Sequence, residues 1–440
     1  MKQYKRVLAG AMLSLCVTAM CGCVMTVDQM YCLPRRSESF TNLQSVMEAA
    51  MEDMVFCAPI AGENQQPVQM ADLNGDGVEE VIAFTKGTQE KPLHIMIFAK
   101  DEEQYYLYTT IDTTGTAFEQ VEYVQLDGQS GKELVVGRQV QNQIQRGMSV
   151  YRFQDGTPER ILNANYQRFL TCAVDGETGR SALVLLNPGG SEAENGRICA
   201  YTMEMGMPVQ LREAELSFPA DEIKRIASGQ MSDGKEAVFV SGGVDDTALC
   251  TDVFTLDNGA VRQILRQDGG AMAAAAVNGV PVFPDDIDHD MTTEMTELIP
   301  LRTMDQQRQA YAVRWYSLDS QGNDLTKLYT YHNYDQGWFM ELEESSVTQM
   351  SVVPEEDGQY GFHMWNEKRG AFERLWTIYV LTGDDRSAQA AQGQRFVLTK
   401  TDTVVYAGEL EDAARLLGVN EEQIRQAFHL IQYDWKTREY

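Results

Sequence analysis

One short acidic loop constrains the fold more than any other stretch of the chain. It reads Asp72-Leu-Asn-Gly-Asp-Gly-Val-Glu-Glu-Val-Ile82. Calcium takes several oxygen ligands, which a loop can supply from alternate positions, including one backbone carbonyl. Gly77 permits the sharp turn that wraps such a loop around an ion. We therefore predict a Ca²⁺ site whose oxygen donors stand at positions 1, 3, 5, 7 and 9: Asp72, Asn74, Asp76, the carbonyl of Val78, and Glu80.

The alternative is an ion-free turn, because Asn-Gly and Asp-Gly are ordinary turn formers. An EF-hand would place Glu at position 12 and a helix on each side, whereas position 12 is Ala83. The residues from Glu80 to Phe84 are mostly apolar and favour a strand. The loop is therefore expected to open a β-strand.

The same frame recurs along the chain as an internal repeat. The copies start at residues 72, 125, 173, 228 and 286, so successive starts are 53, 48, 55 and 58 residues apart. The fifth copy carries the second predicted Ca²⁺ site, although Met291 replaces the turn glycine; its donors are Asp286, Asp288, Asp290 and Glu294. Copies two to four have lost most acidic positions and are expected to bind no ion.

Each copy is followed by short apolar strands, and the spacing is that of propeller blades. One strand pair cannot bury its apolar face alone, so stacking of such units gives a reason for the repeat. We predict an all-β fold, a β-propeller with five clear blades and room for six or seven. The predicted segments are repeats with a leading helix over 40–345, degenerate β blades over 346–408, and a helical tail over 409–440.

The two flanks of the repeats read as helical. Apolar residues at helical spacing predict an amphipathic helix over 41–56, whose Met-rich stripe should pack on the core. In the tail, 410–417 and 421–431 are predicted helices separated by Gly418. A net charge of −29 excludes nucleic acid as a partner, because phosphate binding needs Lys and Arg.

The N-terminus reads as an export signal. Lys2, Lys5 and Arg6 precede an apolar stretch over 7–22, which is short for a membrane span. Met20-Cys21-Gly22-Cys23 resembles a bacterial lipobox, with Met20 and Cys21 departing from the usual residues. We expect a signal peptide over 1–23, lipid attachment at Cys23, a tether over 24–39, and an extracytoplasmic, membrane-anchored lipoprotein of the cell envelope. Ordinary cleavage after Val17-Thr18-Ala19 is the alternative.

Met70-Ala-Asp-Leu-Asn-Gly-Asp-Gly-Val-Glu-Glu-Val-Ile82 resembles the FG-GAP/VCBS-type repeat of integrin-like β-propellers, in which an Asp-x-Asp-x-Asp-Gly loop opens a strand. The resemblance departs from that pattern at Asn74 and Glu80. It implies a propeller in which calcium is structural, and it implies adhesion, ligand-binding or accessory roles.

No metal-binding histidine spacing, nucleophile elbow or phosphate loop is present, and five cysteines outside the signal make no complete disulfide set. A Cys32–Cys57 bridge remains open. We predict a non-catalytic protein that binds or scaffolds, with a protein or glycan ligand. The alternative is an envelope hydrolase acting on carbohydrate or peptide through carboxylates. Such an enzyme would gather perturbed carboxylates in one pocket at the central channel.

Overall fold

The computed structural model describes residues 38–431, apart from 103, 141–145, 155–156, 175–178, 191–194, 244–248, 258, 265–274, 278–279, 305–308 and 356–357. The predicted signal peptide, Cys23 and Cys32 therefore lie outside the described residues. Within the described ranges, no helix combines the length and the apolar character that a membrane crossing requires.

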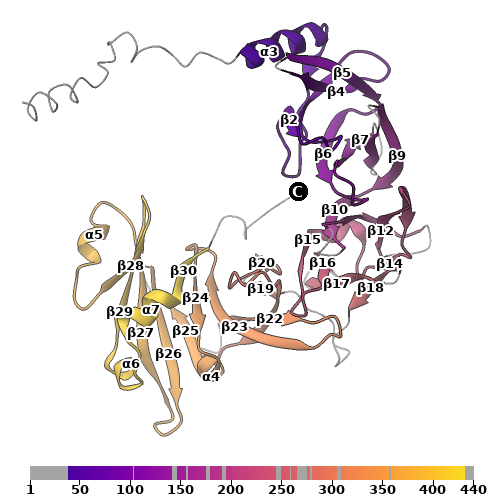
Figure 1. The fold of residues 1–440 in the computed structure, drawn as a ribbon. Helices are drawn as coiled ribbons and strands as arrows, with labels where there is room; N and C mark the ends of the chain where they lie inside the picture. The colour runs from indigo at the N-terminus through magenta and orange to yellow at the C-terminus, as the bar shows by residue number, and fades with distance from the viewer. Residues whose placement is uncertain are drawn as a thin grey trace, which may run out of the picture.

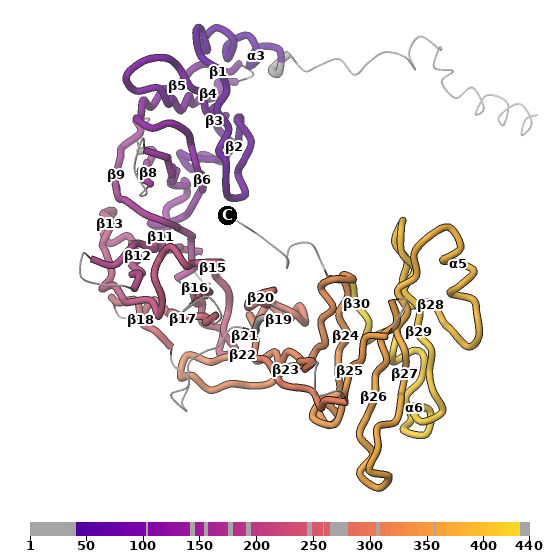
Figure 2. Tube along the Cα trace, turned by 180° about the vertical axis from the view of Figure 1, so that it is seen from behind, coloured from indigo at the N-terminus to yellow at the C-terminus, as the bar shows by residue number. Residues whose placement is uncertain are grey.

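The chain folds into successive antiparallel sheets that follow an open arc (Figures 1 and 2). The first sheet contains β1 (Val55–Phe56), β2 (Val68–Ala71), β3 (Glu80–Lys86), β4 (Leu93–Asp101) and β5 (Gln104–Thr113). The second contains β6 (Ala117–Val124), β7 (Glu133–Gln139), β8 (Arg146–Gln154) and β9 (Thr157–Tyr166). The third contains β10 (Arg168–Ala173), β11 (Ser181–Asn187), β12 (Arg197–Glu204), β13 (Met207–Gln210) and β14 (Ala214–Glu215). The fourth contains β15 (Ile223–Gln230), β16 (Glu236–Gly243), β17 (Leu249–Asp257) and β18 (Ala260–Ile264).

The second half of the arc is less regular. A hairpin of β19 (Ala275–Val277) and β20 (Val280–Val282) precedes a sheet of β21 (Glu294–Pro300), β22 (Tyr311–Leu318), β23 (Asp324–Asn333), β24 (Trp338–Leu342) and β30 (Phe428–Leu430). The last sheet contains β25 (Met350–Pro354), β26 (Gln359–Asn366), β27 (Ala371–Leu381), β28 (Phe396–Lys400) and β29 (Val405–Leu410). Among the described residues, the structure gives helices α3 (Glu38–Ala50), α4 (Glu344–Val347), α5 (Arg386–Gln389), α6 (Asp412–Leu416) and α7 (Glu421–Ala427), and a 3₁₀ turn over Ala220–Glu222.

Strands β3, β7, β11 and β16, one from each of the first four sheets, are buried on both faces. Successive side chains of a strand point to opposite sides, and in β7 Leu134 and Val136 pack into one core cluster while Val135 packs into the next. In β11, Leu183 and Val184 divide in the same way. The sheets are thus stacked face to face, a propeller-like arrangement. This explains why these strands read as continuous apolar runs.

The prediction of a mostly β body is confirmed, but the sheets follow an open arc, and the first and last sheets do not meet (Figure 1). The predicted loop copies one, two and three fall between β2 and β3, between β6 and β7, and between β10 and β11. Copy four differs because residues 228–230 extend β15, which leaves a tight turn closed by a hydrogen bond from the Met231 N–H to the Lys235 carbonyl at 2.8 Å. In copy five, β21 starts at Glu294, so the strand begins at the last predicted donor of the loop.

All three predicted flanking helices are shorter than expected, and the helix predicted over 410–417 is α6. α3 covers 38–50 because Asp53 takes a left-handed conformation (φ 62°) and residues 55–56 pair with β3 as β1. Its apolar stripe packs on β3 and β4, as predicted. The tail helix ends at Ala427, because extended Phe428 stacks on buried Trp338 (ring centroids 5.6 Å apart) and β30 pairs with β24. Cys57, Cys172, Cys199 and Cys250 are free thiols, and the last three are buried.

Candidate functional site

The first predicted metal loop is closed by hydrogen bonds to its own side chains. The two carboxylate oxygens of Asp72 accept from the N–H groups of Gly75 (2.7 Å) and Gly77 (2.9 Å). Asp76 accepts from the Val78 N–H at 2.7 Å. The Asn74 side-chain amide donates to Glu80 at 2.8 Å and to Asp76 at 3.1 Å. An amide N–H₂ group therefore lies between the carboxylates of this loop.

The fifth loop repeats this backbone with a different set of side chains. Asp286 accepts from the N–H groups of Asp290 and Met291, both at 3.0 Å. Asp290 accepts from the Thr292 N–H at 2.8 Å and also pairs with Lys327 of β23. The left-handed conformations of Gly75 and Gly77 (φ 78° and 85°) recur at His289 and Met291 (φ 60° and 72°). Met291 thus adopts the turn geometry of the glycine that it replaces.

The donor set of the fifth loop fits a cation. One oxygen from each of Asp286, Asp288 and Glu294 lies within 4.8 Å of the others. Glu294 is fully buried; its Oε2 accepts the Ile287 N–H at 3.2 Å, and its Oε1 has no hydrogen-bond partner. Burial, and then the nearby Asp288 and Asp290, raise the pKa of Glu294 to about 8. These three carboxylates could hold a metal ion, and a cation there would supply the partner that Oε1 lacks.

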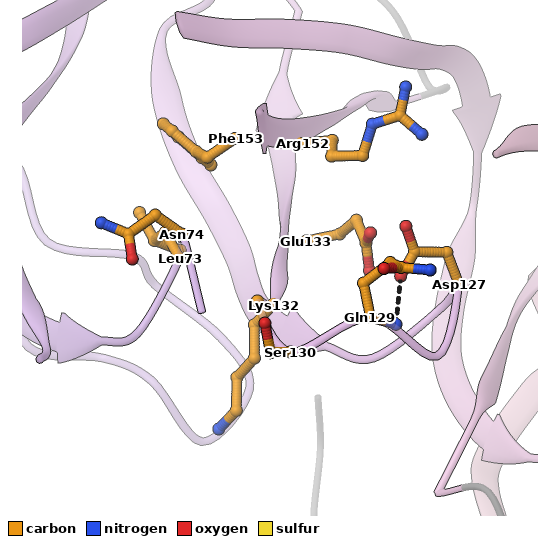
Figure 3. A pocket seen from close by; sticks show the side chains of 10 residues that line it. Leu73, Asn74, Asp127, Gln129, Ser130, Lys132, Glu133, Arg152 and Phe153 are labelled. Atoms are coloured by element: carbon orange, nitrogen blue, oxygen red, sulfur yellow. Dashed lines mark hydrogen bonds between the residues drawn. The ribbon is translucent and has the colours of Figure 1, made fainter. Parts of the chain in front are cut away.

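The second loop retains the Glu of the repeat beside a small pocket of about 190 Å³. Figure 3 shows Leu73 and Asn74 of the first loop on one side of this pocket and Asp127 and Glu133 of the second loop on the other. Buried Glu133 accepts the Leu126 N–H at 2.9 Å, as Glu80 accepts the Leu73 N–H at 2.9 Å. Burial raises the pKa of Glu133 to about 7. A position-9 Glu bonded to the N–H of position 2 is therefore common to loops one, two and five.

A larger pocket, which the sequence did not single out, lies on the inner side of the arc. It is bordered by β6, β10 and β15, the first strands of three successive sheets. These strands lie on the inner side of the arc (Figure 1). Its volume is about 330 Å³, and its lining includes Glu63, Glu122, Arg168 and Arg225. We name these residues and their surroundings the inner-face pocket.

Two carboxylates of the inner-face pocket differ in exposure. Glu122 is half-buried on β6, where it accepts from the side-chain amide of Gln120 at 3.1 Å and that of Asn64 at 3.5 Å. Burial raises its pKa, and the carboxylate of Glu63 adds to the effect. Glu63 itself is exposed. The main chain beside it is held to β6 by hydrogen bonds from the N–H groups of Ile60 and Ala61 to the Glu119 carbonyl.

The candidate catalytic acids of the inner-face pocket escaped sequence analysis because acidic residues are abundant in this chain. One signal was present: Glu119 and Glu122 interrupt an otherwise apolar strand pattern just before a repeat loop. The acid pairs that are adjacent in sequence do not form such a site among the described residues. Glu343 and Glu344, at the start of α4, are exposed; Glu355 pairs with Arg374, and its neighbour Glu356 lies outside the described residues.

The late aromatic residues belong to the core. Trp315, Tyr316 and Trp338 are at most 1% exposed. His332 stacks on Phe339 (5.3 Å between ring centroids), and burial lowers its pKa to about 3. These five buried rings therefore pack in the core and do not line a groove for a glycan.

No protein-family model matches the chain, and neither does any curated protein. Solved structures do match. A putative 6-phosphogluconolactonase from Bacteroides uniformis is 14% identical, with a TM-score of 0.29 over 72% of this chain and 86% of that one. An exotype rhamnogalacturonan lyase is 11% identical, with a TM-score of 0.29 over 66% and 73% of the two chains. A rhamnogalacturonan lyase from Bacillus licheniformis is 13% identical, with a TM-score of 0.29 over 73% and 64%.

These matches contradict the predicted non-catalytic function. The matching structures named above carry the names of enzymes, whereas the main prediction was a non-catalytic protein. At these TM-scores the likeness places no residue of this chain and carries no argument about its substrate. With no family match, the resemblance to FG-GAP/VCBS repeats rests on the loop motif alone.

Proposed function

We propose that this chain is a carbohydrate hydrolase whose active site is the inner-face pocket. One observation carries the proposal: Glu63 and Glu122 line the same pocket, and burial raises the pKa of Glu122. A pair of carboxyl groups in unlike environments is the arrangement that glycoside hydrolysis uses.

In this proposal, Glu122 is the general acid and Glu63 is the general base. Glu122 donates its proton to the glycosidic oxygen as the bond from that oxygen to the anomeric carbon breaks. Glu63 takes a proton from a water molecule, whose oxygen bonds to the anomeric carbon. The products are two shorter sugars with new hydroxyl groups, and proton exchange with solvent returns both carboxyl groups to their starting states.

Release of reducing ends from polysaccharides tests this proposal. Glu122→Gln and Glu63→Gln should each lower the rate by about 100-fold or more, because each removes proton transfer and leaves the side-chain shape almost unchanged. Glu204→Gln, at the exposed end of β12, is the matched control. Equal rates for the parent protein and the Glu122→Gln variant would exclude this site.

The loops contribute stability in this account. The fifth loop would hold Ca²⁺, a proposal supported by its three clustered carboxylates and by the unpartnered Oε1 of Glu294. We regard loops one and five as divergent FG-GAP/VCBS-type loops, since both place left-handed residues at positions 4 and 6. A bound ion would stabilise the folded enzyme by mass action. Attachment outside the cytoplasm through a lipid on Cys23 remains a proposal supported by the N-terminal sequence.

A further inference from the structure

The inner-face pocket contains an arginine that forms no ion pair among the described residues. Arg168, at the start of β10, makes one long hydrogen bond to the Gln167 carbonyl (3.4 Å) and, among the described residues, no ion pair. Glu119, whose charge acts on Arg168, is already engaged: it pairs with Arg146 at 2.5 Å and accepts the Tyr166 hydroxyl at 2.8 Å. The guanidinium of Arg168 is therefore available to a ligand.

A second guanidinium lines the same pocket from the next sheet. Arg225 of β15 forms an ion pair with Asp285 at 3.4 Å, and its guanidinium lies over the ring of Phe283, 5.7 Å from the centroid. Arg225 therefore already has a partner for its charge and for one face of its guanidinium. The contrast singles out Arg168, which is half-buried without a carboxylate partner. Burial and the neighbouring Arg146 lower the pKa of Arg168, so an anion in contact with it would be favoured.

The charge of the whole chain sharpens this contrast. With 36 basic and 65 acidic residues, the surface as a whole repels anions. Against this background, one pocket of about 330 Å³ brings two arginines together with the proposed acid and base. A guanidinium presents parallel N–H groups that match the two oxygens of a carboxylate.

We propose that the substrate of this site is an anionic sugar chain whose carboxylate, that of a uronic acid residue, is bound by Arg168 with Arg225 beside it. The inference rests on the proposed hydrolase function and adds the class of substrate. Arg168 is here a specificity-determining residue: it contacts a group of the substrate that does not react. Neutral sugar chains would lack this contact and would leave the buried cation unpaired.

Calorimetric titration with trigalacturonate and with neutral galactotriose tests the inference on the full chain carrying Glu122→Gln, which prevents turnover. Trigalacturonate should bind at least about tenfold more tightly than galactotriose. Arg168→Gln should remove this preference without weakening the binding of galactotriose. Arg168→Lys keeps the positive charge but not the paired N–H donors of the guanidinium, so it should retain part of the preference. The control Arg262→Gln, on the exposed side of β18, should retain all of it.

Equal affinity for the two trimers, or a preference that survives Arg168→Gln with an unchanged unfolding temperature, would overturn the inference. The two proposals fail separately. Tight, Arg168-dependent binding of trigalacturonate without hydrolysis by the parent protein would refute the hydrolase and keep the anion site. Hydrolysis of neutral chains that depends on Glu122, with no preference for anionic chains, would keep the hydrolase and refute the anion site.

Discussion

The repeat loops and the inner-face pocket both contain glutamates with a raised pKa, but they hold them differently. In the loops, Glu80, Glu133 and Glu294 each accept a main-chain N–H of the same loop, at 2.9, 2.9 and 3.2 Å. In the inner-face pocket, Glu122 is bonded to the side-chain amides of Gln120 and Asn64. Raised pKa alone therefore does not mark a catalytic group. The loop glutamates close turns, and Glu133 does so while lining a small pocket with Asp127. Glu122 instead accepts hydrogen bonds from side-chain amides in the pocket that it shares with Glu63.

The largest expected difference between the two regions is in activity. Glu122→Gln should lower hydrolysis by about 100-fold or more and change the unfolding temperature little, because a half-buried side chain keeps its amide neighbours. Glu133→Gln is the matched change in the loops and should leave the rate unchanged. Paired measurements of rate and thermal unfolding check this. A loss of activity in Glu133→Gln at normal stability would break the comparison.

Glu294→Gln should change stability in opposite directions with and without calcium. In the metal-free protein, the folded pKa of about 8 exceeds the unfolded value of 4.5, so stability falls as pH rises through that window. Removing the charge should then stabilise the metal-free protein at pH 7 by on the order of 3 kcal/mol. The same substitution should abolish stabilisation by calcium. Thermal unfolding in EDTA and in calcium at pH 5 and pH 7 checks both signs.

The contrast between the first and fifth loops explains where sequence reasoning succeeded and where it did not. The repeat frame located the turns before β3, β7 and β11, because side chains that accept main-chain N–H bonds must recur at fixed spacing. By sequence, the first loop is the better metal motif. In the structure, the amide of Asn74 already satisfies Glu80, whereas Asp288 has no N–H to donate and Glu294 keeps an unpartnered oxygen.

The open arc, strand β30 and the inner-face pocket could not be predicted from the sequence. Each depends on residues far apart in the chain: Phe428 stacks on Trp338, and Glu63 and Glu122 line one pocket. Local periodicity contains no information about such partners. The buried strands were predictable because apolar runs of this kind need cover on both faces.

The ammonium group of Lys327 interacts with the carboxylates of the fifth loop and should compete with a metal cation for them. Its ammonium pairs with Asp290, and Asp288 and Glu294 also raise the pKa of Lys327. Lys327→Met should therefore strengthen calcium binding several-fold, by about 1 kcal/mol. Lys400→Met, at the exposed end of β28, is the control. Calcium titration followed by calorimetry checks this, and weaker binding in Lys327→Met would contradict the assigned competition.

The smallest expected effects concern the turn residue at position 6. Met291 is 77% exposed and left-handed, so Met291→Gly should stabilise the protein by up to about 1 kcal/mol. Gly77→Ala should cost a similar amount, and since an added Cβ at Gly77 meets no neighbouring atom, the cost is conformational. Chemical denaturation of the two variants checks the opposite signs. Two changes of the same sign would show that the loops do not share this turn.

The central claim is that the inner-face pocket hydrolyses sugar chains through Glu63 and Glu122. The most direct measurement is the release of reducing ends from polygalacturonate and from a neutral galactan by the parent protein, Glu122→Gln and Glu204→Gln. The account predicts release from polygalacturonate by the parent and the Glu204 variant and almost none by the Glu122 variant. Release that is equal in all three proteins would contradict it.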